Sequence, residues 1–404
     1  MNNKKWMAIL LGGIMAASLA APCSVSAAEK TTLTFWHAMG GTNGEVLQQI
    51  VDDFNASQDE IEIKAEYQGT YDDTITKLKA AMQSDSGLPD VCQMYDVGTK
   101  FMYDSGAVIP VEDKFESTGY DKSSVMEVIS SYYTVDGKQY AMPFNVSTPM
   151  LYYNKDVFEA AGLDPETPPT TYDEVLEDAK KIVESGAAPV GYSQAIYGWF
   201  FEQQLAGLGV TYGNNDNGRK EAVTAVDFDS NGGGLKVFDM WKKLYDSGYF
   251  EDYGTTTADT QTAFFSGQVG MIIESTAILK NAVDSSPFEV GTGYLPRIEQ
   301  NDEGGVIIGG GSLWLTDTGN EANEDAAWKF IEYITTPDVQ AKWSMGTGYF
   351  AINEKAYETE DMKAYLKENP NFETAINQLK DSPVNCNTAG VLSGVQTEAR
   401  LTFN

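Results

Sequence analysis

Residues 143–156 of the chain are PFNVSTPMLYYNKD, and this stretch indicates how the fold is divided. Prolines at positions 143 and 149 each fix their own φ and lack the backbone N–H that a central strand donates. The apolar run from Met150 to Tyr153 is typical of a strand and leads into a helix start at Asp156. We therefore expect the stretch to cross between two lobes, with residues 145–148 facing a cleft. An edge strand of a single large domain is the alternative.

The length of the chain also favours two lobes. At 404 residues it exceeds what one hydrophobic core usually supports. A cleft between two lobes is a common place for a small ligand. We find no internal repeat that would indicate a solenoid instead.

The first 27 residues have the layout of a secretory signal peptide. Two lysines precede a long apolar run and a stretch of small residues, and we expect cleavage after Ala27. A lipid anchor at Cys23 is the alternative, but Pro22 immediately before it fits that signal poorly. No later apolar run is long enough to span a bilayer. The sequence thus predicts export to the periplasm or the extracellular space.

Charge and cysteine content exclude some partners and leave one question open. The formal net charge of −32 repels nucleic acid and anionic lipid, so we expect neither as a partner. Outside the signal peptide, Cys92 and Cys386 are compatible with a disulfide and equally with two free thiols.

The N-terminal part of the chain alternates between strand and helix patterns. Strands are expected at 32–39, 60–67 and 91–95, with a helix from Glu45 and another over 72–83 between them. This order is how parallel α/β sheets begin, and ligands of such sheets bind beyond the carboxyl ends of the strands. The rest of the chain predicts helices at 172–185, 198–208, 235–247 and 325–335, strands at 269–274 and 307–315, and a surface loop at 212–219.

Catalytic chemistry is not favoured by the residue types present. His37 is the only histidine, and on an apolar strand a structural role is favoured over a catalytic one. No Gly-x-Ser-x-Gly elbow is followed by an aspartate and a histidine, and one histidine with two cysteines makes a poor zinc set. We expect a non-catalytic protein with no cofactor and no metal. A pair of carboxylates for glycoside hydrolysis is the enzyme alternative, because the 59 acidic residues offer many pairs.

Aromatic side chains gather at the expected strand and loop ends. Aromatic faces cover the apolar carbons of sugars and polyols, while hydroxyls and carboxylates bind the ligand's OH groups. Any one of these rings is more simply explained as core or rim. Taken together, beside Asp96, Ser147 and Ser275, they suggest a cleft that recognises a polyol. The aromatic residues are Trp36, Tyr71, Tyr95, Tyr152, Trp199 and Tyr349.

Long segments of the chain match one known family. The matching segments lie within 35–37, 67–71, 93–99, 143–156, 161–166, 307–314 and 347–349, and the likeness that they mark extends over nearly the whole chain after the signal peptide. In these segments the chain resembles the extracellular solute-binding proteins of ABC importers, family 1, and within it the members that bind glycerol-3-phosphate. The resemblance implies an α/β fold of the periplasmic-binding-protein type II, with two lobes, a hinge and a ligand cleft between the lobes. We expect lobe 1 at 28–142 and 276–335, and lobe 2 at 143–275 and 336–404.

The same resemblance implies a role in uptake. A monomeric binding protein would close over a small polyol or sugar and deliver it to ABC permease subunits in the membrane. The implied ligand is sn-glycerol-3-phosphate or a glycerophosphodiester. A mono- or oligosaccharide is the alternative ligand, and a secreted glycoside hydrolase is the competing class of protein.

The resemblance also assigns ligand-binding residues. The family's ligand contacts fall on Tyr71, Asp96, Ser147, Ser275, Gly310 and Tyr349, and Trp199 matches one of two tryptophans beside the ligand. Asp96 stands where the family carries a glutamate.

One family contact has no counterpart. Leu392 stands where the family carries an arginine that meets the phosphate. An alkyl chain there removes a charge-assisted contact to an anion, and the sequence leaves open whether Arg400 or another cation replaces it. The resembled proteins also continue past the position of Asn404, which is compatible with a shortened lobe or with a truncated sequence.

Overall fold

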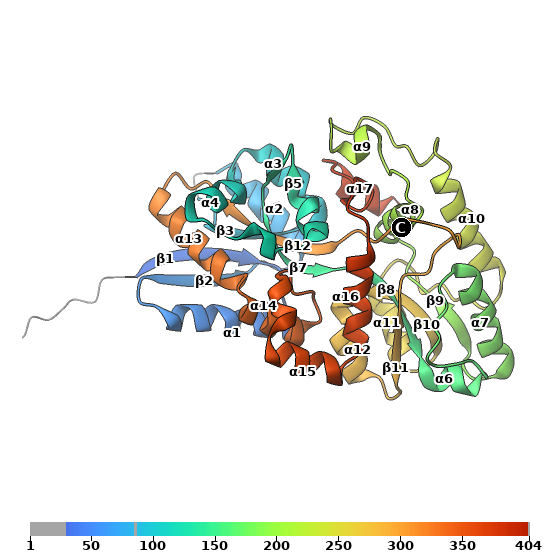
Figure 1. The fold of residues 1–404 in the computed structure, drawn as a ribbon. Helices are drawn as coiled ribbons and strands as arrows, with labels where there is room; N and C mark the ends of the chain where they lie inside the picture. Colours follow the sequence, from blue (N-terminus) through green and yellow to red (C-terminus); the bar gives the residue numbers. More distant parts are fainter. Residues whose placement is uncertain (1–29, 85–86, 403–404) are drawn as a thin grey trace, which may run out of the picture.

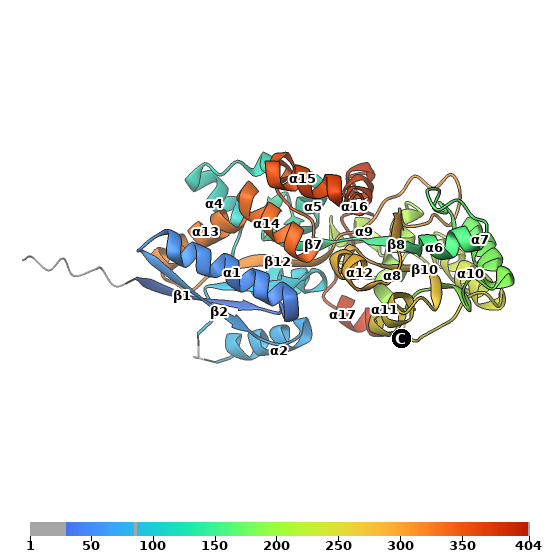
Figure 2. The ribbon, with the colours of Figure 1, turned by 90° about the horizontal axis from the view of Figure 1, so that it is seen from below.

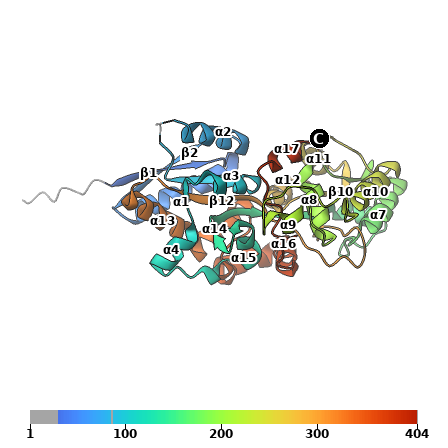
Figure 3. The ribbon, with the colours of Figure 1, turned by 90° about the horizontal axis from the view of Figure 1, so that it is seen from above.

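The computed structural model describes residues 30–84 and 87–402, and its strands form one main sheet in each of two lobes (Figure 1). The signal-peptide prediction, including Cys23, lies outside these ranges. Within them, no helix is long and apolar enough to cross a membrane. The two sheets lie one after the other along the molecule, with helices on both faces (Figures 2 and 3).

Lobe 1 is built on a mixed sheet with the strand order β2-β1-β3-β12-β4, and β7 also pairs with β12. β1 runs parallel to β2 and β3, which confirms the predicted parallel start of the sheet. β12 runs antiparallel to β3, β4 and β7. The strands are β1 (Thr31–His37), β2 (Ile61–Tyr67), β3 (Val91–Tyr95), β4 (Val108–Ile109), β7 (Met142–Ser147) and β12 (Gly309–Thr316).

The helices of lobe 1 bury apolar stripes against this sheet. α1 presents Leu47, Ile50 and Phe54 to the core at helical spacing. Phe54 meets Phe330 of α13 with ring centroids 5.2 Å apart, so distant parts of the chain share one core. The helices are α1 (Gly41–Ser57), α2 (Tyr71–Met82), α3 (Thr99–Ser105), α4 (Val111–Thr118), α5 (Glu127–Ser130), α13 (Glu321–Ile334), α14 (Pro337–Thr347) and α15 (Glu360–Glu368).

Lobe 2 is built on a four-stranded sheet with the order β11-β8-β10-β9. α7 begins with a capping box in which the Thr171 side chain accepts from the Glu174 N–H, and its bounds match the prediction. The strands are β8 (Pro149–Asn154), β9 (Val190–Ser193), β10 (Val269–Ser275) and β11 (Val290–Gly293). The helices are α6 (Lys155–Ala160), α7 (Tyr172–Ser185), α8 (Gly198–Gly207), α9 (Asn214–Gly218), α10 (Gly233–Asp246), α11 (Thr257–Phe265), α12 (Leu279–Ser285) and α16 (Asn371–Asp381).

Several short elements complete the fold. α17 (Gln396–Leu401) lies between the lobes and packs against α8 and η1 (Figure 1). The others are the ribbon β5 (Thr134–Val135) and β6 (Lys138–Gln139) and the 3₁₀ turns η1 (Asp96–Gly98), η2 (Lys122–Ser124), η3 (Ser131–Tyr133), η4 (Thr276–Ile278) and η5 (Glu354–Glu358).

The chain first crosses between lobes at Thr148, within the stretch predicted to do so. Thr148 is fully buried between β7 of lobe 1 and β8 of lobe 2, and its backbone pairs with Thr276. The expected boundary at 142/143 is therefore several residues early, because β7 still belongs to lobe 1. Pro143 fits into β7 because the register against β12 shifts between Gly311 and Ser312, where a strand is allowed an irregular pair.

The later lobe boundaries also differ from the expected ones. β11 pairs with β8 of lobe 2, so the chain returns to lobe 1 only between β11 and β12 rather than at 275/276. α14 packs against α1, so lobe 1 continues past 335. The chain enters lobe 2 again near α16, which packs against β11. The sequence of β11, Val-Gly-Thr-Gly, carries too weak a strand signal for sequence patterns to place it.

Candidate functional site

Three of the seven predicted site residues lie on adjacent strands of lobe 1. Asp96 follows the end of β3, Ser147 ends β7, and Gly310 lies in β12 between them. In the ladder, Gly311 pairs with Tyr95 and Gly309 pairs with Ser147. The sheet order therefore gathers residues that lie far apart in the sequence.

A network of buried polar side chains joins Tyr71 to this sheet. The Asn145 side chain, fully buried in β7, donates from Nδ2 to the Tyr71 hydroxyl at 2.6 Å and accepts from Gln93 Nε2 at 2.6 Å. Burial raises the pKa of Tyr71 well above its ordinary value, and burial also raises the pKa of Tyr349, where hydrogen bonding to Asn145 and Tyr71 opposes it. Both hydroxyls thus stay protonated and able to donate.

The two tyrosine rings are held by their neighbours. Tyr71 begins α2 directly after the Thr70 cap and stacks on Tyr95, with centroids 5.2 Å apart and an 8° interplanar angle. Tyr349 follows the left-handed Gly348 that ends α14 and stacks on Trp343 at 5.7 Å and 9°. Stacked rings lose little further freedom when a ligand binds, so the hydroxyls are pre-oriented.

Trp199 contributes a face and a free donor from lobe 2. Its indole lies against Gly309, where an added β-carbon would stand 2.8 Å from Cζ2. Trp199 is buried, and its Nε1 has no hydrogen-bond partner among the described residues. A buried N–H without an acceptor carries a desolvation penalty, so this atom is suited to meet a ligand or water oxygen.

Not every predicted residue joins the group. The Ser275 hydroxyl accepts from the Ala277 N–H at 3.2 Å and so caps η4 at the hinge; within the described ranges it makes no hydrogen bond to the other six. Tyr152 is fully buried in β8 and donates to the Ser275 carbonyl. Trp36 donates to Glu66 on the neighbouring strand. Tyr152 and Trp36 are therefore structural.

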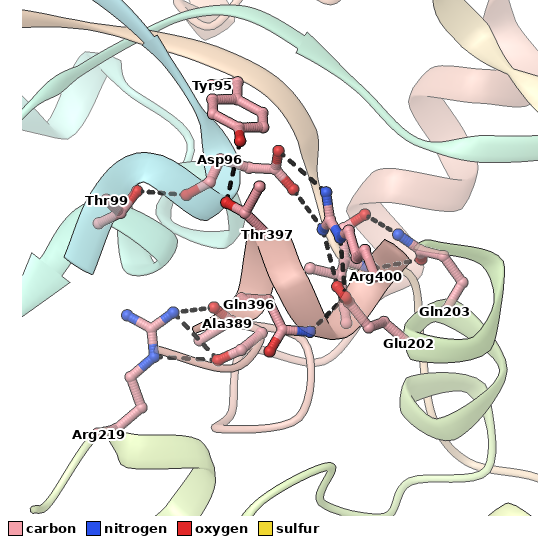
Figure 4. Close-up of polar contacts among 12 residues, drawn as sticks. Tyr95, Asp96, Thr99, Glu202, Gln203, Arg219, Ala389, Gln396, Thr397 and Arg400 are labelled. Atoms are coloured by element: carbon pink, nitrogen blue, oxygen red, sulfur yellow. Dashed lines mark hydrogen bonds and ion pairs between the residues drawn. The ribbon is translucent and has the colours of Figure 1, made fainter. Parts of the chain in front are cut away.

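Asp96 is already engaged by a cation. Arg400 of α17 donates from Nη2 to Asp96 Oδ2 at 2.6 Å and from Nη1 to Oδ1 at 3.3 Å (Figure 4). It also donates from Nε and Nη2 to the two Glu202 oxygens, each at 2.8 Å. Asp96 belongs to lobe 1 and Glu202 to α8 of lobe 2, so one guanidinium joins the lobes. Burial acts to lower the Arg400 pKa, but the two carboxylates raise it well above its ordinary value.

Glu202 was missed by the sequence analysis, although a signal was present. It is the one charged residue of α8, whose sequence is GWFFEQQLAG, and it is 3% exposed. Acidic residues are rarely fully buried without a partner, so a lone acid in an apolar helix indicates one. Leu392, by contrast, is buried and carries no charge. Arg400 is thus the guanidinium that the fold brings to Asp96.

A second arginine joins the lobes without a carboxylate. Arg219 donates to the carbonyl oxygens of Tyr132 and Thr134 in lobe 1. It also donates to those of Gly390 and of Ala389, the latter labelled in Figure 4. Burial lowers its pKa to about 10. Its loop, predicted to lie on the surface, is instead anchored through the buried Asn217.

The loop holds this arginine through an unusual backbone. Asn215, Asp216 and Asn217 have φ values of 58°, 54° and 58°, in the left-handed region that asparagine and aspartate tolerate best. The Asn217 side chain accepts from the N–H groups of Tyr212 and Gly213.

The seven predicted residues lie outside two cavities of the described structure. A cavity of about 710 Å³ lies between lobe 1 and the segments 216–219 and 384–389. Another of about 570 Å³ lies in lobe 2 and is bordered by residues 292–306 and α16. Neither cavity is lined by any of the seven residues.

His37 and the cysteines are structural in this fold. His37 is 6% exposed, its Nδ1 accepts from the Met39 N–H, and burial lowers its pKa to about 4. The structural role favoured for it is therefore supported. Cys92 and Cys386 are both free thiols, which decides the question left open by the sequence.

Comparison with known proteins shows to which family this chain belongs. A model for bacterial extracellular solute-binding proteins matches residues 49–374. The sn-glycerol-3-phosphate-binding periplasmic protein UgpB of Brucella abortus is 33% identical over 95% of this chain and 89% of its own. The chain belongs to the family of bacterial extracellular solute-binding proteins. The Escherichia coli UgpB is 31% identical over 92% of this chain and 85% of its own.

Solved structures of binding proteins share the fold. The cyclic alpha-maltosyl-1,6-maltose binding protein of Arthrobacter globiformis has a TM-score of 0.75 and 25% identity, over 92% of this chain and 91% of its own. UgpB from Mycobacterium tuberculosis, in complex with glycerophosphocholine, has a TM-score of 0.76 and 23% identity, over 88% and 87% of the two chains. The predicted two-lobed α/β fold and family are confirmed.

Proposed function

We propose that this protein is the extracellular component of an ABC importer and that it binds sn-glycerol-3-phosphate or a glycerophosphodiester for uptake. The observation that carries the proposal is the likeness to the UgpB proteins, which extends over most of the length of this chain and of theirs. These relatives are binding proteins, and the proposed activity is binding without catalysis.

The geometry supports a polyol ligand held by fixed donors and acceptors. Tyr71, Tyr349 and the Trp199 Nε1 can donate to ligand oxygens, and Asp96 can accept from ligand hydroxyls. The Gly310 backbone N–H is proposed as a further donor to the ligand. Ser147 and Ser275 stand on the two strands that enter the hinge, one from each lobe. All seven residues are proposed as ligand contacts.

The proposal extends to location and partners. An extracellular family and a sequence with the layout of a signal peptide point to an exported protein. ABC permease subunits in the membrane would receive the ligand, and a monomer suffices to form the cleft between its own lobes.

A mono- or oligosaccharide is the second candidate ligand. The flat indole of Trp199 over Gly309 suits the apolar face of a sugar ring, and Leu392 brings no charge for a phosphate. The maltosyl-maltose-binding relative favours it further.

Ligand-dependent thermal unfolding of the mature protein tests the proposal. A ligand at 100 times its dissociation constant adds about 2.7 kcal/mol to the free energy of unfolding, which is several degrees in melting temperature. We expect stabilisation by glycerol-3-phosphate or glycerophosphocholine. Stabilisation by maltose alone would favour the second candidate, and product release from a glycoside would indicate an enzyme.

A further inference from the structure

We propose that Arg400 determines the charge preference of the ligand cleft: it stays bound to Glu202 and exchanges Asp96 for the anionic group of a ligand. This inference rests on the proposed function. It assigns to a residue of α17 the cationic contact that Leu392 does not provide.

The two ion pairs of Arg400 differ in a way that predicts which one exchanges. Glu202 is held by two contacts of 2.8 Å from Nε and Nη2, and Gln396 donates to it as well. Asp96 is held by one contact of 2.6 Å and a second of 3.3 Å. Arg400 therefore holds Glu202 with the better pair of hydrogen bonds. Its Nη1, which makes only the long contact with Asp96, retains an N–H that can donate to a ligand.

Packing also ties Arg400 to lobe 2. A β-carbon at Gly198, the first residue of α8, would stand 2.5 Å from the Arg400 Cα, so the backbones of α8 and α17 touch. α17 also meets lobe 1, through η1 and a 3.0 Å contact between the hydroxyls of Thr397 and Tyr95, but within the described residues its backbone touches only α8 this closely. When the lobes separate, we therefore expect Arg400 to move with Glu202 and the Asp96 pair to break. The exposed Nη1–Nη2 edge then faces the cleft from the lobe opposite Asp96.

Charge balance makes the preference testable. Asp96, Glu202 and Arg400 together carry one net negative charge, and their side chains are 5%, 4% and 16% exposed, so water screens them little. Glu202 neutralises the guanidinium and weakens its attraction for an anion. Removal of the Glu202 charge should consequently strengthen binding of a phosphate ligand, whereas a purely structural ion pair predicts the opposite or no change.

The decisive variants are Glu202→Gln and Arg400→Lys, with Arg297→Gln, an exposed arginine of lobe 2, as the matched control. Dissociation constants are measured by calorimetry for glycerol-3-phosphate, glycerophosphocholine and maltose. We expect Glu202→Gln to tighten phosphate binding at least about tenfold, and Arg400→Lys, which keeps the charge but loses the fork, to weaken it about tenfold. In both variants the dissociation constant for maltose should change by less than the dissociation constants for the phosphate ligands.

Arg400→Gln supplies the complete loss of charge. We expect it to weaken phosphate binding by about 100-fold, and circular dichroism with thermal melting shows whether it still folds. If it does not fold, the two conservative variants decide. Wild-type binding of phosphate with no tightening in Glu202→Gln, or equal losses for phosphate and maltose in Arg400→Lys, overturns this inference alone. A wild-type protein that binds no phosphate ligand overturns the inference and the proposed ligand together.

Discussion

Gly310 lies so close to Asn145 that a β-carbon at position 310 would overlap the carbonyl oxygen of residue 145. The same glycine has a φ of +93°, which L side chains rarely adopt. The close approach of β12 and β7 thus depends on a missing side chain, and it brings the Asn145 amide within reach of Tyr71.

The first prediction concerns this glycine. Gly310→Ala should lower the free energy of unfolding by at least about 3 kcal/mol, because strain at positive φ and steric overlap act together. Gly319→Ala is the control, since Gly319 also has a positive φ, +69°, but its β-carbon would meet nothing within 4 Å. Urea unfolding measures both. Equal losses in the two variants would show that the approach to Asn145 adds nothing.

Tyr71 permits a test of the polar network. Tyr71→Phe removes the hydroxyl that accepts from Asn145, so it should cost about 1–3 kcal/mol of stability and weaken ligand binding about tenfold or more. Tyr103→Phe removes a hydroxyl that donates to Asp136 on the surface and should change neither property much. Calorimetry and denaturant unfolding provide the two readouts. Unchanged affinity in Tyr71→Phe would remove Tyr71 from the ligand site.

The buried histidine predicts a pH dependence of stability. The pKa of His37 is about 4 in the fold against an ordinary 6.5, so the unfolded chain binds the proton first as the pH falls. Stability is therefore complete above pH 6.5 and declines as the pH falls from there toward 4. From pH 7.5 to pH 5 this residue should account for a loss of about 2 kcal/mol. In His37→Asn that part of the slope should vanish, leaving the contribution of the carboxylates.

Thiol labelling should separate the two cysteines. Cys92 is fully buried and its pKa is raised to about 12 by that burial, whereas Cys386 is only partly buried. In the native protein a water-soluble disulfide reagent should modify Cys386 and leave Cys92 unmodified until the protein unfolds. Cys386→Ser is the control. Rapid labelling of Cys92 in that variant would contradict the structure of the lobe 1 sheet.

Arg219 should influence how far the lobes open. Arg219→Lys keeps a charge but cannot reach four carbonyl oxygens on two lobes, so the unliganded protein should favour a more open form. Small-angle scattering should show a larger radius of gyration than in wild type, and saturating ligand should reverse the change. Lys220→Gln, at the exposed neighbouring position, should behave like wild type. An unchanged radius would show that these contacts do not restrain the hinge.

Local structure was predictable where local signals agree. The helix 172–185 has an amphipathic pattern and a capping box, and its observed bounds are the same as the predicted ones. The loop 212–219 was predicted wrongly as a surface loop. Its left-handed residues and the anchoring of Arg219 depend on carbonyl groups far along the chain, which no window of sequence displays.

The candidate site also contains residues that could be predicted from the sequence and residues that could not. Asp96 and Gly310 were predicted together only through the family resemblance, because the antiparallel pairing of β12 with β3 that brings them close joins segments more than 200 residues apart. The ion bridge of Arg400 could not be placed, because α17 reaches Asp96 and Glu202 only once both lobes have formed. The missed lobe boundaries have a similar origin, since β11 is a strand only by virtue of its pairing with β8.

The repeated crossing between lobes has a consequence for biogenesis. β12, which pairs with β3, β4 and β7, is synthesised after all of the strands of the other lobe's sheet. A growing chain therefore cannot complete its first lobe until most of its length has left the ribosome. Pairings between such distant segments form slowly. Until β12 is added, the lobe 1 sheet therefore remains incomplete, because β3 and β7 both lack the partner that joins them.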